Sequence, residues 1–207
     1  MFDELKDTII DGNEQKAKAL TAQFLNAGEN PREILDKGLL AGMEVVGRRF
    51  KTYEMYLPEV LMSASAMKTA FNLLKPHFKK SEDIFLGKVV MATIEGDVHD
   101  IGKNIVSMML ECCGFEVIDL GVDVPVRKII ETCTEETADL IGISALLTTT
   151  MMALEGAVRM IRGETTGVKV MVGGAPLTHE FAEKIGADGF APDALRAINM
   201  AKGLIGK

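Results

Sequence analysis

Residues 88–113 read Lys88-Val-Val-Met-Ala-Thr-Ile94, then Glu-Gly96-Asp97-Val-His99-Asp-Ile-Gly102-Lys-Asn104, then Ile105-Val-Ser-Met-Met-Leu-Glu-Cys-Cys113. The first part is an apolar run of strand length, and the last part is an apolar segment typical of a buried helix. The polar middle predicts a loop that leads from a strand into a helix and carries one histidine between aspartates. In an open parallel sheet, such loops lie at the carboxyl edge, where ligands bind.

The pattern of a short apolar run followed by a helical segment continues through residues 86–207. The strand-like runs cover residues 88–94, 116–119, 140–144, 169–172 and 189–191. The helical patterns cover residues 101–113, 126–134, 149–163, 178–185 and 193–204. This alternation predicts an α/β fold, a parallel sheet with helices on both faces. Five strands favour the flavodoxin-like (Rossmann-like) order 2-1-3-4-5, in which His99 follows the strand at the ligand-binding switch point.

Residues 1–85 have a different pattern, in which apolar residues recur every three or four positions. This spacing predicts four helices near residues 1–11, 13–25, 32–50 and 57–75. Because their connections are short, we expect a small four-helix bundle. Pro76 and the polar residues after it predict a link over 76–87. We therefore expect two domains, a helical domain over 1–85 and an α/β domain over 86–207.

Composition and charge restrict the classes of function. The chain has 207 residues, a net charge of −7 and no cluster of Lys and Arg, which argues against a nucleic-acid partner. No apolar run approaches the roughly 20 residues of a membrane-spanning helix, and the first residues lack the layout of a secretory signal. The three cysteines lack metal-finger spacing and fit a reducing compartment. We expect a cytoplasmic protein with no nucleic-acid or membrane partner.

The residues around His99 alone leave the chemistry of the predicted loop open. A histidine in this position can act as a metal ligand, act as a base, or do neither. A carboxylate two residues away, as Asp97 is, can hold the ring of the histidine in one tautomer. Gly102 permits the close approach of a backbone or a ligand. The pattern Asp-x-His-x-x-Gly therefore marks a candidate site without naming its ligand.

Three short motifs together resemble a corrinoid-binding signature. Asp97-x-His99-x-x-Gly102, Ser144-x-Leu146 and Gly173-Gly174 occur in this order along the chain. The longer text Gly-Asp-Val-His-Asp-Ile-Gly-Lys-Asn at 96–104 is similar to the cobalamin-binding module of methionine synthase. It also resembles the small corrinoid proteins of methylamine and methanol methyltransferase systems in anaerobes. Because 50–60 resembles the cap of the methionine synthase module, the resemblance covers essentially the whole chain.

The resemblance implies a specific set of site residues. His99 is the implied metal ligand and replaces the dimethylbenzimidazole base below cobalt. The residues implied to act in the chemistry are Asp97, His99 and Thr150, where Thr150 stands in place of a serine in the ligand relay of methionine synthase. The residues implied around the corrin are Gly96, Asp97, Val98, His99, Asp100, Ile101 and Gly102. Those implied to line the slot for the nucleotide tail are Ser144, Leu146, Thr148, Gly173, Gly174 and Ala175. Those implied to cap the methyl face of the corrin are Phe50, Leu57 and Val60.

The resemblance also implies a function. Cobalamin would alternate between cob(I)alamin, which accepts a methyl group, and methylcob(III)alamin, which donates one. The implied partners are a substrate-specific corrinoid methyltransferase and a second methyltransferase that acts on a folate or thiol acceptor, with a reductive activase as a further candidate. No residue of the chain resembles a site for the methyl donor. We therefore expect a cofactor-bearing subunit rather than a self-sufficient enzyme.

Other functions stay open alongside this one. The small subunit of an adenosylcobalamin-dependent mutase shares the Asp-x-His-x-x-Gly motif and the fold, although the helical cap argues against it. A corrinoid-binding sensor would need a DNA-reading helix-turn-helix and a basic face, and neither is apparent. A flavodoxin-like nucleotide binder without a metal would make His99 incidental. Binding of cobalamin separates the last of these from the rest.

Overall fold

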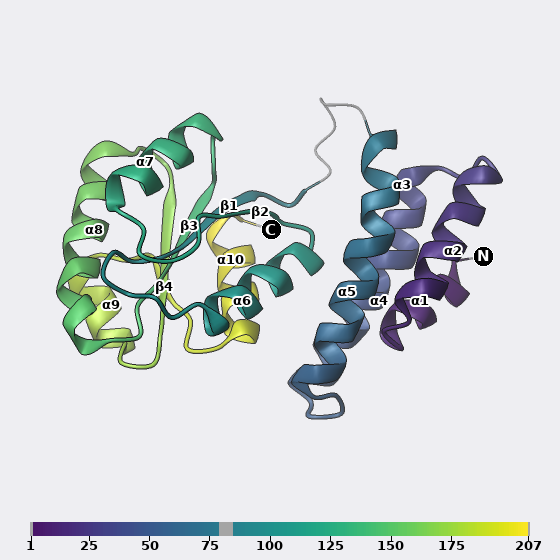
Figure 1. Cartoon of the computed structure of the whole chain (residues 1–207), viewed down its shortest axis with the longest axis horizontal. Coiled ribbons are helices and arrows are strands. Elements are labelled where there is room, and N and C mark those ends of the chain that lie inside the picture. The colour runs from purple at the N-terminus through teal and green to yellow at the C-terminus, as the bar shows by residue number, and fades with distance from the viewer. Residues whose placement is uncertain (1, 79–84, 207) are drawn as a thin grey trace. The chain divides into compact units, whose positions relative to one another are not determined.

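The computed structural model describes residues 2–78 and 85–206 (Figure 1). The chain divides into two compact units, the first made of residues 1–84 together with 112–114 and the second of residues 85–111 and 115–207. The predicted link over 76–87 includes residues 79–84, which lie outside the described residues. No helix among the described residues is both long enough and apolar enough to span a membrane.

The described part of the first unit is helical, as the sequence predicted. Its helices are α1 (Asp3–Ile10), α2 (Glu14–Asn26), α3 (Pro31–Glu33), η1 (Ile34–Leu40), α4 (Ala41–Lys51), α5 (Leu57–Leu74) and η2 (Lys75–His77). The single helix expected over 32–50 is helical throughout, but η1 in its middle is a π-helix. Two glycines one turn apart, Gly38 and Gly42, let α1 pack closely. A Cβ at Gly38 would lie 2.7 Å from Cδ2 of Leu5, and a Cβ at Gly42 would lie 2.8 Å from Cβ of Ile9.

The second unit is a five-stranded parallel sheet covered by helices. Its strands are β1 (Lys88–Thr93), β2 (Glu116–Asp119), β3 (Leu140–Ser144), β4 (Lys169–Gly173) and β5 (Gly189–Phe190). Its helices are α6 (Ile101–Cys112), α7 (Val126–Glu135), η3 (Thr148–Thr150), α8 (Met151–Glu164), α9 (His179–Ile185) and α10 (Ala194–Leu204). The strand order is β2-β1-β3-β4-β5, and all pairs are parallel. The predicted fold class and strand order are confirmed.

The layers of the second unit place its candidate site residues at one edge. Helices α7, α8 and α9 cover one face of the sheet, and α6 and α10 cover the other (Figure 1). The first face holds a core of fully buried aliphatic residues, such as Val90, Ile141 and Val158. In the register of the sheet, Thr93, Ser144 and Gly173 lie side by side at the ends of β1, β3 and β4. The loops that follow these strands therefore meet at the carboxyl edge.

Candidate functional site

The histidine lies on the loop between β1 and α6, residues 94–100, which we call the His99 loop. The sheet fixes the start of this loop, because Ile94 N–H donates to the carbonyl of Ser144 at 3.0 Å. Its end is held by Thr93, whose hydroxyl donates to the carbonyl of His99 at 2.9 Å. Gly96 has a φ of +84°, a left-handed conformation that glycine adopts at little cost. The loop is thus anchored to its own strand and to the neighbouring one.

Asp97 is the buried centre of the site, with none of its surface exposed. Its Oδ2 accepts hydrogen bonds from the N–H of Leu146 at 2.7 Å, the N–H of Leu147 at 3.2 Å and the hydroxyl of Thr150 at 3.1 Å. Its Oδ1 lies 3.1 Å from the backbone nitrogen of His99 and 2.8 Å from the ring Nδ1 of the same residue. The carboxylate therefore joins the His99 loop to the segment after β3.

These hydrogen bonds keep Asp97 ionised. Burial raises the pKa of a carboxyl group, because it disfavours the charged form. Here the donors outweigh burial, with Leu146 N–H first among them, and the pKa of Asp97 falls from 3.8 to about 2. An ionised carboxylate only accepts hydrogen bonds, so the Nδ1 of His99 carries the proton in their contact.

The consequence of this contact is that the other ring nitrogen of His99 is available as a ligand. In a neutral imidazole with a protonated Nδ1, Nε2 carries a lone pair. Among the described residues, Nε2 has no hydrogen-bond partner, and the side chain of His99 is 48% exposed. Three apolar side chains close to His99 are also exposed. Val98 and Ile101 are its neighbours in the sequence, and Leu146 is the residue whose N–H donates to Asp97. The site therefore presents one ring nitrogen with a lone pair, close to exposed apolar side chains.

This donor set fits a metal that brings most of its own ligands. No group of three or more His, Cys, Asp or Glu residues in the described part of the chain could hold a bare metal ion. A single imidazole backed by a carboxylate suits an axial position, where the remaining ligands come from a macrocycle. Exposed apolar side chains beside it suit the flat, largely apolar face of such a ring. The residues present therefore fit a corrinoid.

The residues predicted for the tail slot lie at the ends of β3 and β4 and directly after them. Ser144 and Gly173 are paired in register, Leu146 donates to Asp97 through its N–H, and Thr148 begins η3. Gly174 has a φ of +137°, and a Cβ there would collide with the carbonyl oxygen of Ala145. This close approach of two backbones explains glycine at 174 without a ligand. Ala175 comes next and is exposed.

The residues predicted for the cap lie in the first unit. Phe50 is in the last turn of α4, and Leu57 and Val60 are in the first turn of α5. Phe50 and Leu57 are half-buried, and Val60 is fully buried. The short connection between the two helices brings these three positions to the same end of the helix pair.

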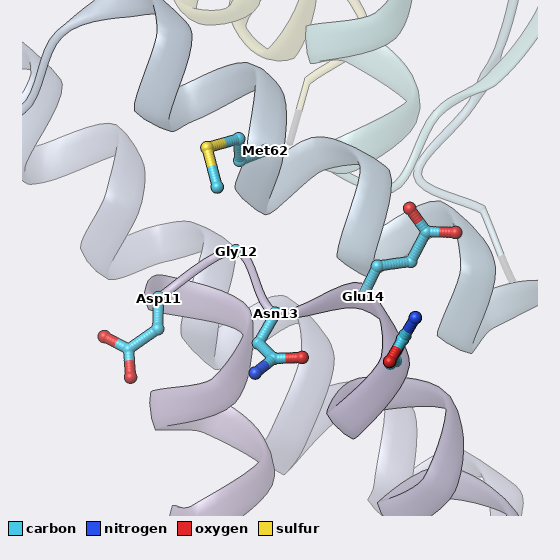
Figure 2. A pocket seen from close by; sticks show the side chains of 6 residues that line it. Asp11, Gly12, Asn13, Glu14 and Met62 are labelled. Carbon is cyan, nitrogen blue, oxygen red and sulfur yellow. The ribbon is translucent and has the colours of Figure 1, made fainter.

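The first unit also has an open pocket of about 520 Å³ that contains none of the predicted site residues. Figure 2 shows it between the α1–α2 turn and α5, with Met62 on one side and Asp11, Asn13 and Glu14 on the other. The carboxylate of Glu14 already accepts hydrogen bonds from Ser65 and Thr69 at 2.9 Å each, and these bonds lower its pKa. Glu14 therefore serves to join α2 to α5.

Sequence reasoning missed the segment after β2 as part of the site. Asp123 lies there, and its side chain and backbone both contact the His99 loop. Asp119 at the end of β2 pairs with Lys103, which is buried in the first turn of α6. The sequence does point to this segment, because the predicted strand order places the strand at 116–119 next to the one that precedes His99, and Asp119 and Asp123 lie at its end and after it. The specific pairing depends on tertiary packing.

Comparisons with known proteins agree with this geometry. A family model described as a B12 binding domain matches residues 87–199, and a second model with that description matches residues 1–75. The chain is 46% identical to dimethylamine corrinoid protein 3 of Methanosarcina acetivorans, over 99% of this chain and 97% of that protein. It is 42% identical to trimethylamine corrinoid protein 1 of the same organism, over 97% of this chain and 94% of that protein.

A solved structure is similar over nearly the whole chain. A chain of the methanol:cobalamin methyltransferase complex MtaBC from Methanosarcina barkeri superposes with a TM-score of 0.89 at 31% identity, covering 98% of this chain and 78% of that one. The resemblance drawn from the three sequence motifs is thereby confirmed. The chain belongs to the family of corrinoid proteins that combine a helical and a Rossmann-like B12-binding domain, and its cofactor is cobalamin.

Proposed function

We propose that this protein carries a methyl group on the cobalt of bound cobalamin, with Nε2 of His99 as the lower axial ligand. The observation that supports this most is the 2.8 Å contact between Asp97 and Nδ1 of His99. This contact places the ring proton on Nδ1 and leaves the lone pair of Nε2 available. Cobalamin supplies a metal that can accept a methyl group as cobalt(I) and donate it from cobalt(III). The residues of the chain bind this cofactor, orient its ligand and exclude water.

Asp97 and His99 are proposed as a tuning pair for the ligand. The buried carboxylate holds the ring in one orientation and one tautomer, and its negative charge makes Nε2 a stronger donor. A metal at Nε2 would require that nitrogen to carry no proton, and the hydrogen bond to Asp97 places the ring proton on Nδ1 instead.

Thr150 is proposed as a weaker third member of this group. Its hydroxyl lies 3.1 Å from Asp97 Oδ2 and 2.9 Å from the carbonyl oxygen of Leu147. A hydroxyl has one proton, so it can donate fully to only one of these acceptors at a time. The N–H groups of Leu146 and Leu147 hold Asp97 Oδ2 in either case. We therefore assign most of the positioning of Asp97 to the backbone.

The remaining predicted residues are proposed to surround the cofactor. The ends of β3 and β4 and the segments that follow them, with Ser144, Leu146, Thr148 and the Gly173–Ala175 turn, are the candidates for the nucleotide tail. The first unit is proposed to cover the methyl face through Phe50, Leu57 and Val60. Apolar side chains there would exclude water and oxygen from a reactive metal centre.

We infer that the methyl donor and acceptor are handled by separate partner proteins. The relatives are named for dimethylamine and trimethylamine, and the MtaBC structure is a complex with a methanol:cobalamin methyltransferase. By analogy, a donor-specific methyltransferase and a second methyltransferase for a folate or thiol acceptor are the proposed partners, and a reductive activase would restore oxidised cobalt. The match of residues 1–75 to a B12-binding model favours this over a mutase subunit.

The ligand assignment can be tested by reconstituting the protein with methylcobalamin and recording its visible spectrum. We expect wild type to show a histidine-ligated spectrum and His99→Ala to show that of cofactor without a nitrogen ligand. His179→Ala is the control, because that side chain is 74% exposed and lies on α9. An unchanged spectrum in His99→Ala would contradict the assignment.

A further inference from the structure

The segment between β2 and α7 makes a reciprocal contact with the His99 loop. The N–H of Asp123 donates to the carbonyl oxygen of Asp97 at 2.9 Å. In return, Oδ1 of Asp123 accepts the N–H of Gly96 at 2.7 Å. Asp123 has a φ of +53°, a conformation that Asp and Asn tolerate better than other residues with side chains. Asp123 therefore holds the backbone on both sides of the Gly96–Asp97 peptide.

An ion pair between a buried lysine and a partly exposed aspartate anchors the start of this segment. The Nζ of Lys103 lies 2.5 and 2.6 Å from the two carboxylate oxygens of Asp119, and the side chain of Lys103 is only 1% exposed. Asp119 Oδ1 also accepts the N–H of Gly121 at 2.9 Å. Lys103 belongs to the first turn of α6, directly after the His99 loop. The pair thus ties the end of that loop to the segment that carries Asp123.

The same segment returns to the strand that precedes the loop. The carbonyl oxygen of Gly121 accepts the N–H of Thr93 at 2.9 Å. Thr93 in turn holds the carbonyl of His99 through its hydroxyl. The His99 loop is therefore held from the β2 side by Asp123 and from the β3 side by the donors to Asp97 Oδ2.

We propose that Asp123 is a positioning residue for His99, with the Lys103–Asp119 pair as its anchor. It acts by fixing the Asp97 backbone, so that the Asp97 carboxylate meets the imidazole and Nε2 points outward before the cofactor arrives. Preorganisation of this kind increases affinity, because less ordering remains to be done on binding. The inference rests on the proposed role of His99 as a ligand.

The chain offers a matched control in Asp139. This exposed aspartate makes the same reciprocal contact at the opposite edge of the sheet. Its Oδ2 accepts the N–H of Lys88 at 2.8 Å, and its own N–H donates to the carbonyl of Lys88 at 2.9 Å. Asp139→Ala therefore removes a hydrogen bond of the same type without touching the His99 loop.

The test compares full-length Asp123→Ala, Asp123→Asn and Asp139→Ala. In the apo-protein, hydrogen exchange is measured at the amide of Gly96. In the reconstituted protein, the dissociation constant for methylcobalamin and the fraction of histidine-ligated cofactor are measured. We expect Asp123→Ala to accelerate exchange at Gly96 and to weaken binding about tenfold, as one lost hydrogen bond to a carboxylate would. Asp123→Asn keeps an acceptor and the backbone conformation, so we expect it to restore most of both.

The outcomes separate this inference from the proposed function. If Asp123→Ala and Asp139→Ala behave alike in exchange, binding and spectrum, the inference is wrong. Equal impairment of Asp123→Ala and Asp123→Asn would also overturn it, because the acceptor would then not matter. If the reconstituted wild-type protein and His99→Ala have the same visible spectrum, the proposed function is overturned and this inference with it.

Discussion

At the scale of single residues, Asp97 determines what His99 can do. Its carboxylate is fully buried and is surrounded by donors from the His99 loop, Leu146, Leu147 and Thr150. Burial of an unpaired charge would be costly, and here each oxygen has at least two donors. The same donors that stabilise the charge also fix the tautomer of His99.

The lowered pKa of Asp97 predicts a pH-dependent contribution to stability. Each pKa unit corresponds to about 1.4 kcal/mol, so the change from 3.8 to about 2 contributes on the order of 2 kcal/mol. The unfolded chain binds the proton first as pH falls, so this contribution is complete above about pH 5 and is lost between about pH 4 and pH 2. Urea unfolding of the apo-protein should show a larger gap between wild type and Asp97→Asn at pH 7 than near pH 2. A gap that is the same at both pH values would contradict this origin.

The residues of the site differ in how well sequence could predict them. Asp97 and His99 stand in one short motif, and local chain geometry alone brings a carboxylate to a histidine two residues away. Thr150 comes from a distant segment, and its place near Asp97 rested on resemblance. Asp123 carried no motif, because its contact with Gly96 depends on how two loops pack at the sheet edge.

At the scale of elements, the first turn of α6 is fixed by the Lys103–Asp119 pair. Removing Lys103 leaves Asp119 with fewer partners. The side chain of Asp119 is 33% exposed, so water can partly replace the lost contact. We expect Lys103→Met to destabilise the apo-protein by about 2–3 kcal/mol, below the 3–5 kcal/mol of a fully buried pair. The double variant Lys103→Met/Asp119→Asn should recover part of this loss, because Asn still accepts the N–H of Gly121.

The control for this prediction is a pair whose lysine is exposed. Lys169 lies 3.4 Å from Asp188, and the side chain of Lys169 is 44% exposed. Lys169→Met should cost less than about 1 kcal/mol, because an exposed lysine contributes little and Asp188 keeps its contacts with Arg162 and the N–H of Val170. Equal losses of unfolding free energy in Lys103→Met and Lys169→Met would show that burial of Lys103 is unimportant.

Element positions in the α/β unit were predictable because apolar runs and helical periods alternate there. The predicted strands agree with β1 to β5 within one residue at each end. The helix expected over 32–50 was harder, since its apolar spacing indicates a helix but does not distinguish α from π geometry. Gly38, within this π-helix, packs closely against Leu5 of α1, a tertiary contact that the apolar spacing does not contain.

At the scale of the whole molecule, both units belong to the B12-binding family. The relatives match over nearly the full length, so the helical unit accompanies the sheet unit in them as well. We propose that the helical unit protects the methyl face of the cofactor. Met62 of α5 lines the pocket beside the α1–α2 turn, and that pocket contains none of the proposed cap residues. Met62 is therefore a suitable control position for tests of the cap.

The proposed cap predicts a change in reactivity without loss of binding. In protein reconstituted with cobalamin and then reduced, Leu57→Ala should increase the rate of reoxidation in air several-fold, because a smaller side chain admits oxygen and water. The rate is measured by visible absorbance. Met62→Ala, on the same helix and 56% exposed, should reoxidise like wild type. Equal rates for Leu57→Ala and Met62→Ala would argue against a cap at this position.

The most direct test of the account is electron paramagnetic resonance of bound cob(II)alamin in protein labelled with 15N-histidine. The unpaired electron couples to the nitrogen below cobalt, and 15N splits each cobalt line into two whereas 14N splits it into three. With unlabelled cofactor, ligation by His99 predicts doublets that disappear in His99→Ala. The chain has three histidines, so this variant assigns the signal. Triplets from the labelled wild-type protein would mean that the cofactor keeps its own base, and would contradict His99 as the ligand.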